Sequence, residues 1–257
     1  MSALHNPTYT PDTPSLGESW VGQKISAHHV GLCVLFLAAF IIRLVFAAHL
    51  PPEKTWGDAG TYDSIARHLI AGNGYASGPL DAPNLTRQRP PTYPIFVAIV
   101  YLIFGPNPKA VVLVQTLLGS CIPLLAYGLG CRIFDRRAGL LAASILAVYP
   151  ALIYYDTRLL REGLTAFLIT WTLFLSCDTQ QACQRASRLI SVGVLLAAVS
   201  MCRPETLVLA GPVVYLIVGP TRNLRPLLRP ALLVALPILL VWLPWTIRNY
   251  VAFGTLS

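Results

Sequence analysis

The longest polar stretch of the chain, residues 57–94, lies between two hydrophobic segments. It contains a carboxylate and a guanidinium, Asp58 and Arg89, together with two tyrosine hydroxyls, Tyr62 and Tyr93. A carboxylate can accept a proton or ligate a divalent cation, and an arginine can bind a phosphate through two parallel hydrogen bonds. Because the rest of the chain is so apolar, we expect this loop to lie at a water interface and to carry function.

Further charged groups interrupt the hydrophobic pattern at three later points. They are Asp156, Arg158, Arg161 and Glu162 in the first, Arg203 and Glu205 in the second, and Arg248 in the third. If seven spans follow a cytoplasmic N-terminus, all three points lie on the same outer side as residues 57–94. Carboxylates and arginines that meet at one interface suit a substrate with a lipid phosphate.

Each candidate residue also has a purely structural interpretation. Asp58 is positioned to be the N-cap of a helix, and Glu162 could pair with Arg158 at i,i+4 on a helix surface. Three arginines could instead anchor or snorkel toward lipid headgroups: Arg89, Arg203 and Arg248. The sequence contains no Gly-rich phosphate loop, nucleophile elbow or metal-binding motif. Spacing alone therefore predicts a polytopic membrane protein with an outer polar site.

The composition supports a membrane location. Of the 257 residues, 55% are hydrophobic and only 12% are charged, and the mean hydropathy is +0.61. A soluble domain carries about a quarter of its residues as charges. The net charge of +8 comes from basic residues scattered between apolar segments, which orients a membrane protein and excludes a nucleic-acid interface. The six cysteines lack the spacing of a zinc site and are predicted to be structural thiols.

Seven membrane spans are predicted. They lie at about residues 30–50, 109–132, 138–155, 163–177, 188–202, 206–219 and 229–246. The fifth and sixth could also form one hairpin, because Arg203-Pro204-Glu205 separates them. Arg43 lies inside the first span, and snorkelling to the interface is favoured over a place in the bundle. Residues 1–28 are predicted to be a polar cytoplasmic tail before an uncleaved first helix.

Within the polar stretch, Ala59–Ala71 is predicted to form an amphipathic helix at the membrane surface, and Gly72 is placed to end it. The apolar face comprises Tyr62, Ile65, Ala66, Leu69 and Ile70, whereas Asp63, Ser64, Arg67 and His68 lie off that face. The apolar segment 93–104 is too short to cross a bilayer and is predicted to be an interfacial or re-entrant helix.

Several motifs occur in a recognisable order. The pattern GDxxxYxxxAxxLxxGxGY is followed by RPPxYPxFxA, YxxFG and QxLLG, where the glutamine is Gln115. FDRRAGLLAA at 134–143, REGLTAFL at 161–168, the Arg203-Pro204-Glu205 turn and PWTIRNYVAFG at 244–254 complete the set. Together they resemble the N-terminal half of bacterial GT-C glycosyltransferases of the family 39 and dolichyl-phosphate-mannose-protein mannosyltransferase type. The resemblance covers nearly the whole chain from residue 30 onward.

The resemblance implies a function and a set of site residues. This family transfers a sugar from a polyprenyl-phosphate donor to a lipid, glycan or protein acceptor at the outer face of the membrane. Asp58 matches the essential acidic residue, although Ala59 replaces the Glu that often follows it. Glu162 matches a second, metal-associated carboxylate, so that a divalent ion shared by Asp58 and Glu162 is an alternative to a base role for Asp58. Arg89 is expected near the donor phosphate, and Tyr62 and Tyr93 are expected to line the site.

The sequence thus predicts an all-α polytopic protein of the bacterial inner membrane, with about seven transmembrane helices, that contacts membrane lipids. Residues 29–257 are expected to form a GT-C-type module whose outer loop spans residues 51–91. Arg203 and Arg248 complete the expected substrate-binding set. Relatives are usually longer, so the C-terminal outer domain of the family is expected to be absent. Two alternatives stay open: a transporter or flippase of lipid-linked sugars, and an inactive truncated partner subunit.

Overall fold

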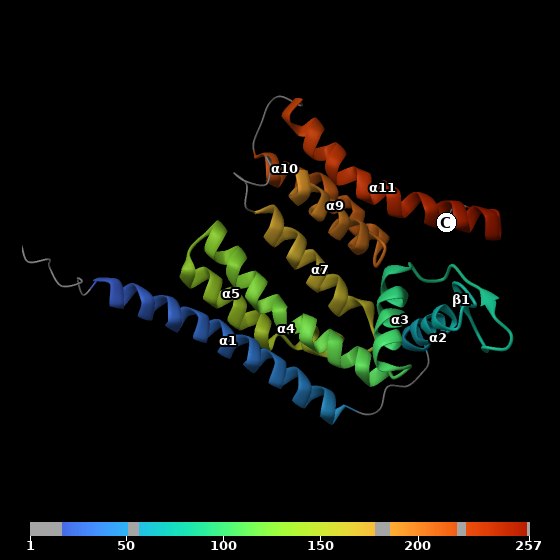
Figure 1. Cartoon of the computed structure of the whole chain (residues 1–257), viewed down its shortest axis with the longest axis horizontal. Helices are drawn as coiled ribbons and strands as arrows, with labels where there is room; N and C mark the ends of the chain where they lie inside the picture. The colour runs from blue at the N-terminus through green and yellow to red at the C-terminus, as the bar shows by residue number, and fades with distance from the viewer. Residues whose placement is uncertain (1–16, 51–56, 178–185, 220–224, 256–257) are drawn as a thin grey trace, which may run out of the picture. The chain divides into compact units, whose positions relative to one another are not determined.

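The computed structural model describes residues 17–50, 57–177, 186–219 and 225–255. It is essentially all-α (Figure 1), as the sequence predicts. The helices are α1 (Gly17–His49), α2 (Asp58–Ile70), α3 (Thr92–Phe104), α4 (Pro108–Ile133), α5 (Arg136–Val148), α6 (Pro150–Asp156), α7 (Arg161–Ser176), α9 (Ala186–Ser200), the 3₁₀ helix η1 (Pro204–Leu209), α10 (Ala210–Val218) and α11 (Arg225–Phe253). A short antiparallel pair, β1 (Ala76–Ser77) and β2 (Asn84–Leu85), follows α2.

The chain divides into two compact units, Met1–Val34 and Leu35–Ser257. The first unit, where the structure describes it, is the N-terminal part of α1. This helix begins at Gly17, well before the predicted end of the polar tail at residue 28, because no proline occurs between Pro14 and Pro51 to interrupt it. The second unit contains the rest of α1 and all the candidate site residues.

All seven predicted spans are helical, but they differ in length. Three helices in the described ranges are long and apolar enough to cross a membrane: Val30–His49 of α1, α4 and α11. A fourth crossing results if α5 and α6, which are bent by 54°, form one broken span. The bend falls at Tyr149-Pro150, since a residue before proline is driven out of the helical region. Helices α7, α9 and η1–α10 are shorter, so seven crossings remain a prediction.

Helix α4 packs against α5 and α7, and α9 packs against α7 and α11. Glycines allow these backbones to approach closely: a Cβ at Gly130 of α4 would overlap Gly139 of α5, and one at Gly193 of α9 would press on the Val234 carbonyl of α11. One apolar core lies among α2, α3, α4, α7 and α9, and a second among α9, α10 and α11. Within the second unit, α2, α3 and β1 lie at one end of the helices (Figure 1).

The predicted amphipathic helix is present as α2, with Tyr62, Ile65 and Ala66 buried on the expected face. It ends as predicted at Gly72 (φ 82°), where the amides of Gly72 and the next residue close a Schellman motif on the last turn. His68, which was predicted to lie off that face, is nevertheless fully buried. Its ring lies 3.0 Å from the Gly78 carbonyl, so the loop after α2 folds back over this side of the helix.

Candidate functional site

Asp58 begins α2, and its side chain does not cap the helix. The N-cap is Gly57 (φ 70°), and no side-chain hydrogen bond caps this end, so the N-cap interpretation of Asp58 was wrong. Instead Asp58 Oδ1 forms an ion pair with Arg89 Nη2. The Asp58 side chain is 46% exposed and that of Arg89 26%, so solutes can reach the carboxylate while the guanidinium is partly enclosed.

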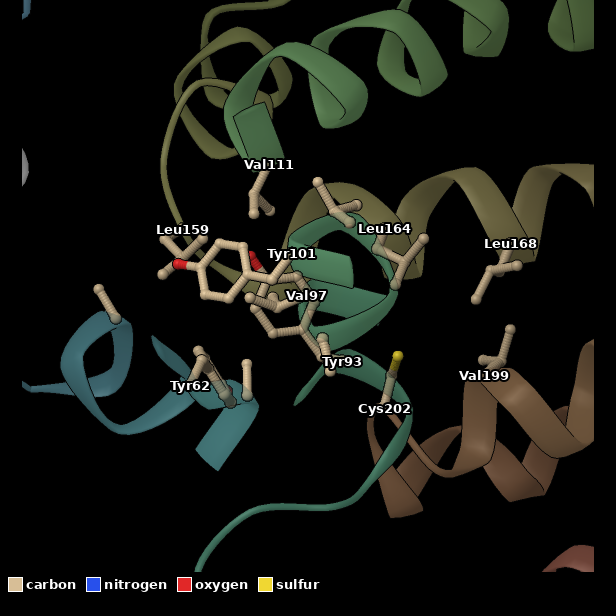
Figure 2. Close-up of a cluster of buried hydrophobic side chains, with 14 of the residues drawn as sticks. Tyr62, Tyr93, Val97, Tyr101, Val111, Leu159, Leu164, Leu168, Val199 and Cys202 are labelled. Carbon is tan, nitrogen blue, oxygen red and sulfur yellow. The ribbon is translucent and has the colours of Figure 1, made fainter. Parts of the chain in front are cut away.

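Two tyrosine rings pack next to this ion pair. The Arg89 guanidinium lies over the Tyr62 ring at 5.6 Å, and the Tyr62 and Tyr93 rings meet edge to face at 4.6 Å. Both rings belong to the buried cluster shown in Figure 2. In the described part of the chain, the buried Tyr62 hydroxyl and the buried Nε of Arg89 have no hydrogen-bond partner. Two buried donors at this point therefore lack an acceptor, which calls for an explanation.

The Tyr62 hydroxyl is surrounded by four charged side chains. Burial raises its pKa to about 12, against the opposing effects of Arg161 and Arg89, while Asp58 and Glu162 reinforce the rise. A phenol with this pKa is protonated at neutral pH and can only act there as a hydrogen-bond donor or a neutral acceptor. Asp58 and Glu162 thus both influence the pKa of this one buried hydroxyl, and their joint action in catalysis stays a prediction.

Glu162 lies in the first turn of α7 and is held by two arginines. Its Oε1 is 2.6 Å from Arg203 Nη2 and 3.8 Å from Arg161 Nε. The hydrogen bond to Glu162 raises the pKa of Arg203 above its ordinary value. Pairing with Arg158 at i,i+4 was the wrong expectation, because Arg158 precedes the start of α7 at Arg161. Arg203 also lies 3.5 Å from Glu205 of the same turn.

Arg161 was predicted only to lie among the charges of its segment, with no role assigned to it, and the structure places it close to Glu162. Its Nη1 donates to the Cys202 carbonyl at 2.9 Å, which joins the start of α7 to the end of α9. Its Nε is buried without a hydrogen-bond partner among the described residues. The available signal was its position beside Glu162, at the point where the turn after α6 meets α7.

Arg248 of α11 contacts the loop after α2. Its two amino groups donate to the Thr86 carbonyl at 2.8 Å and to the Tyr75 carbonyl at 3.0 Å, and its guanidinium lies 5.5 Å from the Tyr75 ring. The Tyr75 hydroxyl in turn donates to the Arg89 carbonyl at 2.8 Å. These contacts indicate that Arg248 holds the loop in place. They do not favour the predicted role in which Arg248 contacts the substrate directly.

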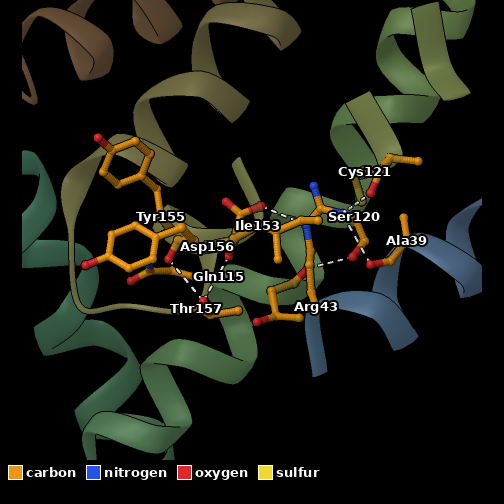
Figure 3. A network of polar contacts seen from close by, with 12 residues as sticks. Ala39, Arg43, Gln115, Ser120, Cys121, Ile153, Tyr155, Asp156 and Thr157 are labelled. Atoms are coloured by element: carbon orange, nitrogen blue, oxygen red, sulfur yellow. Dashed lines mark hydrogen bonds and ion pairs between the residues drawn. The ribbon is translucent and has the colours of Figure 1, made fainter. Parts of the chain in front are cut away.

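Arg43 does not snorkel, so that prediction was wrong. It is completely buried, and its Nε lies 2.8 Å from Oδ2 of the equally buried Asp156 at the end of α6 (Figure 3). Its Nη1 also donates to the Ala147 carbonyl at 3.2 Å. A Cβ at Gly119 or Gly163 would overlap the Asp156 carboxylate, so both neighbouring helices are shaped around it. A charge inside the membrane is stable when a partner lies at the same depth.

The residues present fit a divalent cation poorly. Asp58 and Glu162, the expected ligands, each have an arginine at the carboxylate, and a guanidinium there opposes the binding of a second cation. Across the described ranges there is no group of three histidine, cysteine, aspartate or glutamate side chains arranged to hold a metal. The shared metal therefore stays a prediction, and the proposed reaction does not require it.

Residues 88–246 match a family model described as dolichyl-phosphate-mannose-protein mannosyltransferase. The chain belongs to this family. The match covers more than half of the chain and includes Arg89, Glu162 and Arg203, whereas Asp58 and Arg248 lie outside it. Together with the apolar helices, it makes the protein a membrane glycosyltransferase of the GT-C type, as the motif order predicted. No curated protein matches the chain.

Proposed function

We propose that this mannosyltransferase-family protein moves a sugar from a polyprenyl-phosphate donor to a hydroxyl of an acceptor at the outer face of the membrane. The observation that carries the proposal is the Asp58–Arg89 pair above Tyr62, where a base, a cation and two unpartnered donors converge. Membership of this family supports a lipid-linked donor. A base beside a phosphate-binding arginine is what sugar transfer from such a donor requires.

In the proposed reaction, the Asp58 carboxylate takes the proton of the acceptor hydroxyl as its oxygen attacks the anomeric carbon. The bond from that carbon to the phosphate oxygen breaks, and its electron pair leaves with the polyprenyl phosphate. Negative charge therefore grows on the phosphate, where Arg89 and the Tyr62 hydroxyl are placed to stabilise it. The donor phosphate and Asp58 compete for one guanidinium, so donor binding also frees the Asp58 carboxylate to act as a base.

The other candidates receive supporting roles in this proposal. Arg203, whose guanidinium is shared by Glu162 and Glu205, orients Glu162 at the edge of the site. Arg248 holds the loop that carries Arg89. The outer side is supported by the positive-inside rule, because Arg132 at the end of α4 and Arg136 at the start of α5 flank a basic turn that is expected to be cytoplasmic. We also propose, from the motif resemblance, that the protein lies in a bacterial inner membrane and that residues 29–257 form the catalytic module.

Replacing Arg89 by glutamine tests the donor-binding role. We expect the KM for a labelled polyprenyl-phosphate sugar to rise about 10- to 100-fold in liposomes, because a charge-assisted contact to phosphate contributes about 1.5–3 kcal/mol. Arg87→Gln is the matched control, since it removes the same charge from the same loop, at a residue that contacts Thr255 and Phe253. Equal rises in KM for both variants would mean that Arg89 acts only through the overall charge of the loop.

A further inference from the structure

The side-chain amide of Gln115, on α4, forms hydrogen bonds to two separate segments of the chain, the start of α3 and the turn between α6 and α7. The side chain is buried, and its Nε2 donates to the carbonyls of Arg158 at 3.0 Å and Leu160 at 3.3 Å. Its Oε1 accepts the hydroxyl hydrogen of Tyr93 at 2.5 Å. Figure 3 shows Gln115 beside the turn between α6 and α7. A buried amide with every polar atom engaged fixes its partners in distance and in direction.

The two segments that Gln115 joins carry the two halves of the candidate site. On one side, the Tyr93 ring packs on Tyr62, whose other neighbour is the guanidinium of Arg89. On the other side, the Leu160 carbonyl belongs to the residue just before Arg161 and Glu162. A continuous series of contacts therefore runs from the Asp58–Arg89 pair, through two tyrosines and Gln115, to the turn that leads into Glu162.

We infer that Gln115 is a positioning residue that sets the placement of the Glu162 segment relative to the Asp58–Arg89 pair. Its effect on catalysis rests on the proposed function, whereas its effect on the turn does not. The inference also changes the role of Tyr93, which the sequence analysis assigned to substrate binding. The Tyr93 hydroxyl is hydrogen-bonded to Gln115, and the residue is only 1% exposed. Tyr93 therefore fixes the position of the Tyr62 ring and does not contact the substrate.

Gln115→Met tests the inference, because methionine fills a similar volume and makes neither set of hydrogen bonds. In hydrogen–deuterium exchange, we expect the amides of residues 157–162 to exchange faster in this variant than in the wild type. The control is Thr172→Val, which removes a buried hydrogen bond that stays within α7, to the Leu168 carbonyl. Exchange at residues 157–162 that is unchanged, or raised equally by both variants, would overturn the inference.

The kinetic arm separates positioning from general support of the fold. We expect kcat of Gln115→Met to fall about 10- to 100-fold, because a shift of the site residues by about 1 Å costs a reaction rate of this order. The KM for the donor should change little. Tyr93→Phe removes only the hydroxyl that binds Gln115. It should lower kcat in the same way, and the double variant should be no worse than Gln115→Met alone.

Each other outcome counts against the inference or against the proposed function. Additive effects, or a rise in KM for Tyr93→Phe, would place Tyr93 against substrate and overturn the assignment. Faster exchange with an unchanged kcat would overturn the positioning role. If the wild type shows no sugar transfer, the proposed function fails, and the exchange measurement still decides whether Gln115 holds the turn. If Gln115→Met does not fold, Tyr93→Phe supplies both readouts.

Discussion

Asp58→Asn is expected to lower the rate of sugar transfer by about 10²- to 10⁴-fold, the usual contribution of a positioned general base. Asparagine keeps the shape of the side chain and can still accept a hydrogen bond from Arg89, but it cannot take a proton from the acceptor hydroxyl. Donor binding should therefore survive, and the loss should appear in kcat. Initial rates with a labelled lipid donor, at saturating donor and acceptor, measure this directly.

Asp63→Asn is the matched control for this variant. Asp63 lies on the same helix and also pairs with an arginine, Arg67, at 2.8 Å, and it accepts the Tyr101 hydroxyl hydrogen. The control thus removes a carboxylate of similar structural role from α2 and should keep most of the activity. Equal losses in the two variants would show that the carboxylates of this helix support the fold and that Asp58 is not the base.

Arg43→Met is expected to lower the free energy of unfolding by about 3–5 kcal/mol, because it leaves the buried Asp156 carboxylate without its partner. The pair joins α1 to the end of α6. Helix α1 is otherwise mostly exposed, since only about 11% of its apolar stretch within Val30–His49 is buried. Unfolding by SDS in mixed micelles measures the change.

Neutralising the partner as well provides the control. In the double variant Arg43→Met with Asp156→Asn, no uncompensated charge remains, so most of the lost stability should return. The asparagine keeps the shape that Gly119 and Gly163 are packed against. If the double variant is as unstable as the single one, the contribution of Arg43 is packing and hydrogen bonding to α1 and α5, and the ion pair does not hold the helix.

The sequence predicted the parts of the fold that depend on local patterns. The face of α2 defined by Tyr62 and Ile65 and the stop at Gly72 follow from helical periodicity and from the left-handed backbone that glycine tolerates. That Asp58, Arg89 and Glu162 lie on one side of the membrane was predicted from a seven-span topology, and it stays a prediction, while the Asp58–Arg89 pair itself is present in the structure. The motif order predicted the family, which the comparison with family models confirmed.

Contacts between distant segments could not be predicted in the same way. Arg43 and Asp156 are 113 positions apart, and whether an arginine inside a span snorkels or pairs depends on what lies at its depth in the assembled bundle. The partner of Glu162 proved to be Arg203, 41 positions later, because the turn between α9 and η1 packs beside the start of α7. The burial of His68 could not be predicted for a similar reason, because the loop that covers it has no periodic pattern.

The most direct test of Asp58-dependent sugar transfer uses the purified wild-type chain in liposomes that contain a polyprenyl-phosphate sugar labelled in the sugar. The account predicts that label moves from the lipid to a hydroxyl acceptor, that one polyprenyl phosphate is released per sugar transferred, and that Asp58→Asn stops both. Transfer that continues at the wild-type rate without the Asp58 carboxylate, or labelled lipid that stays intact with every hydroxyl acceptor offered, would contradict it.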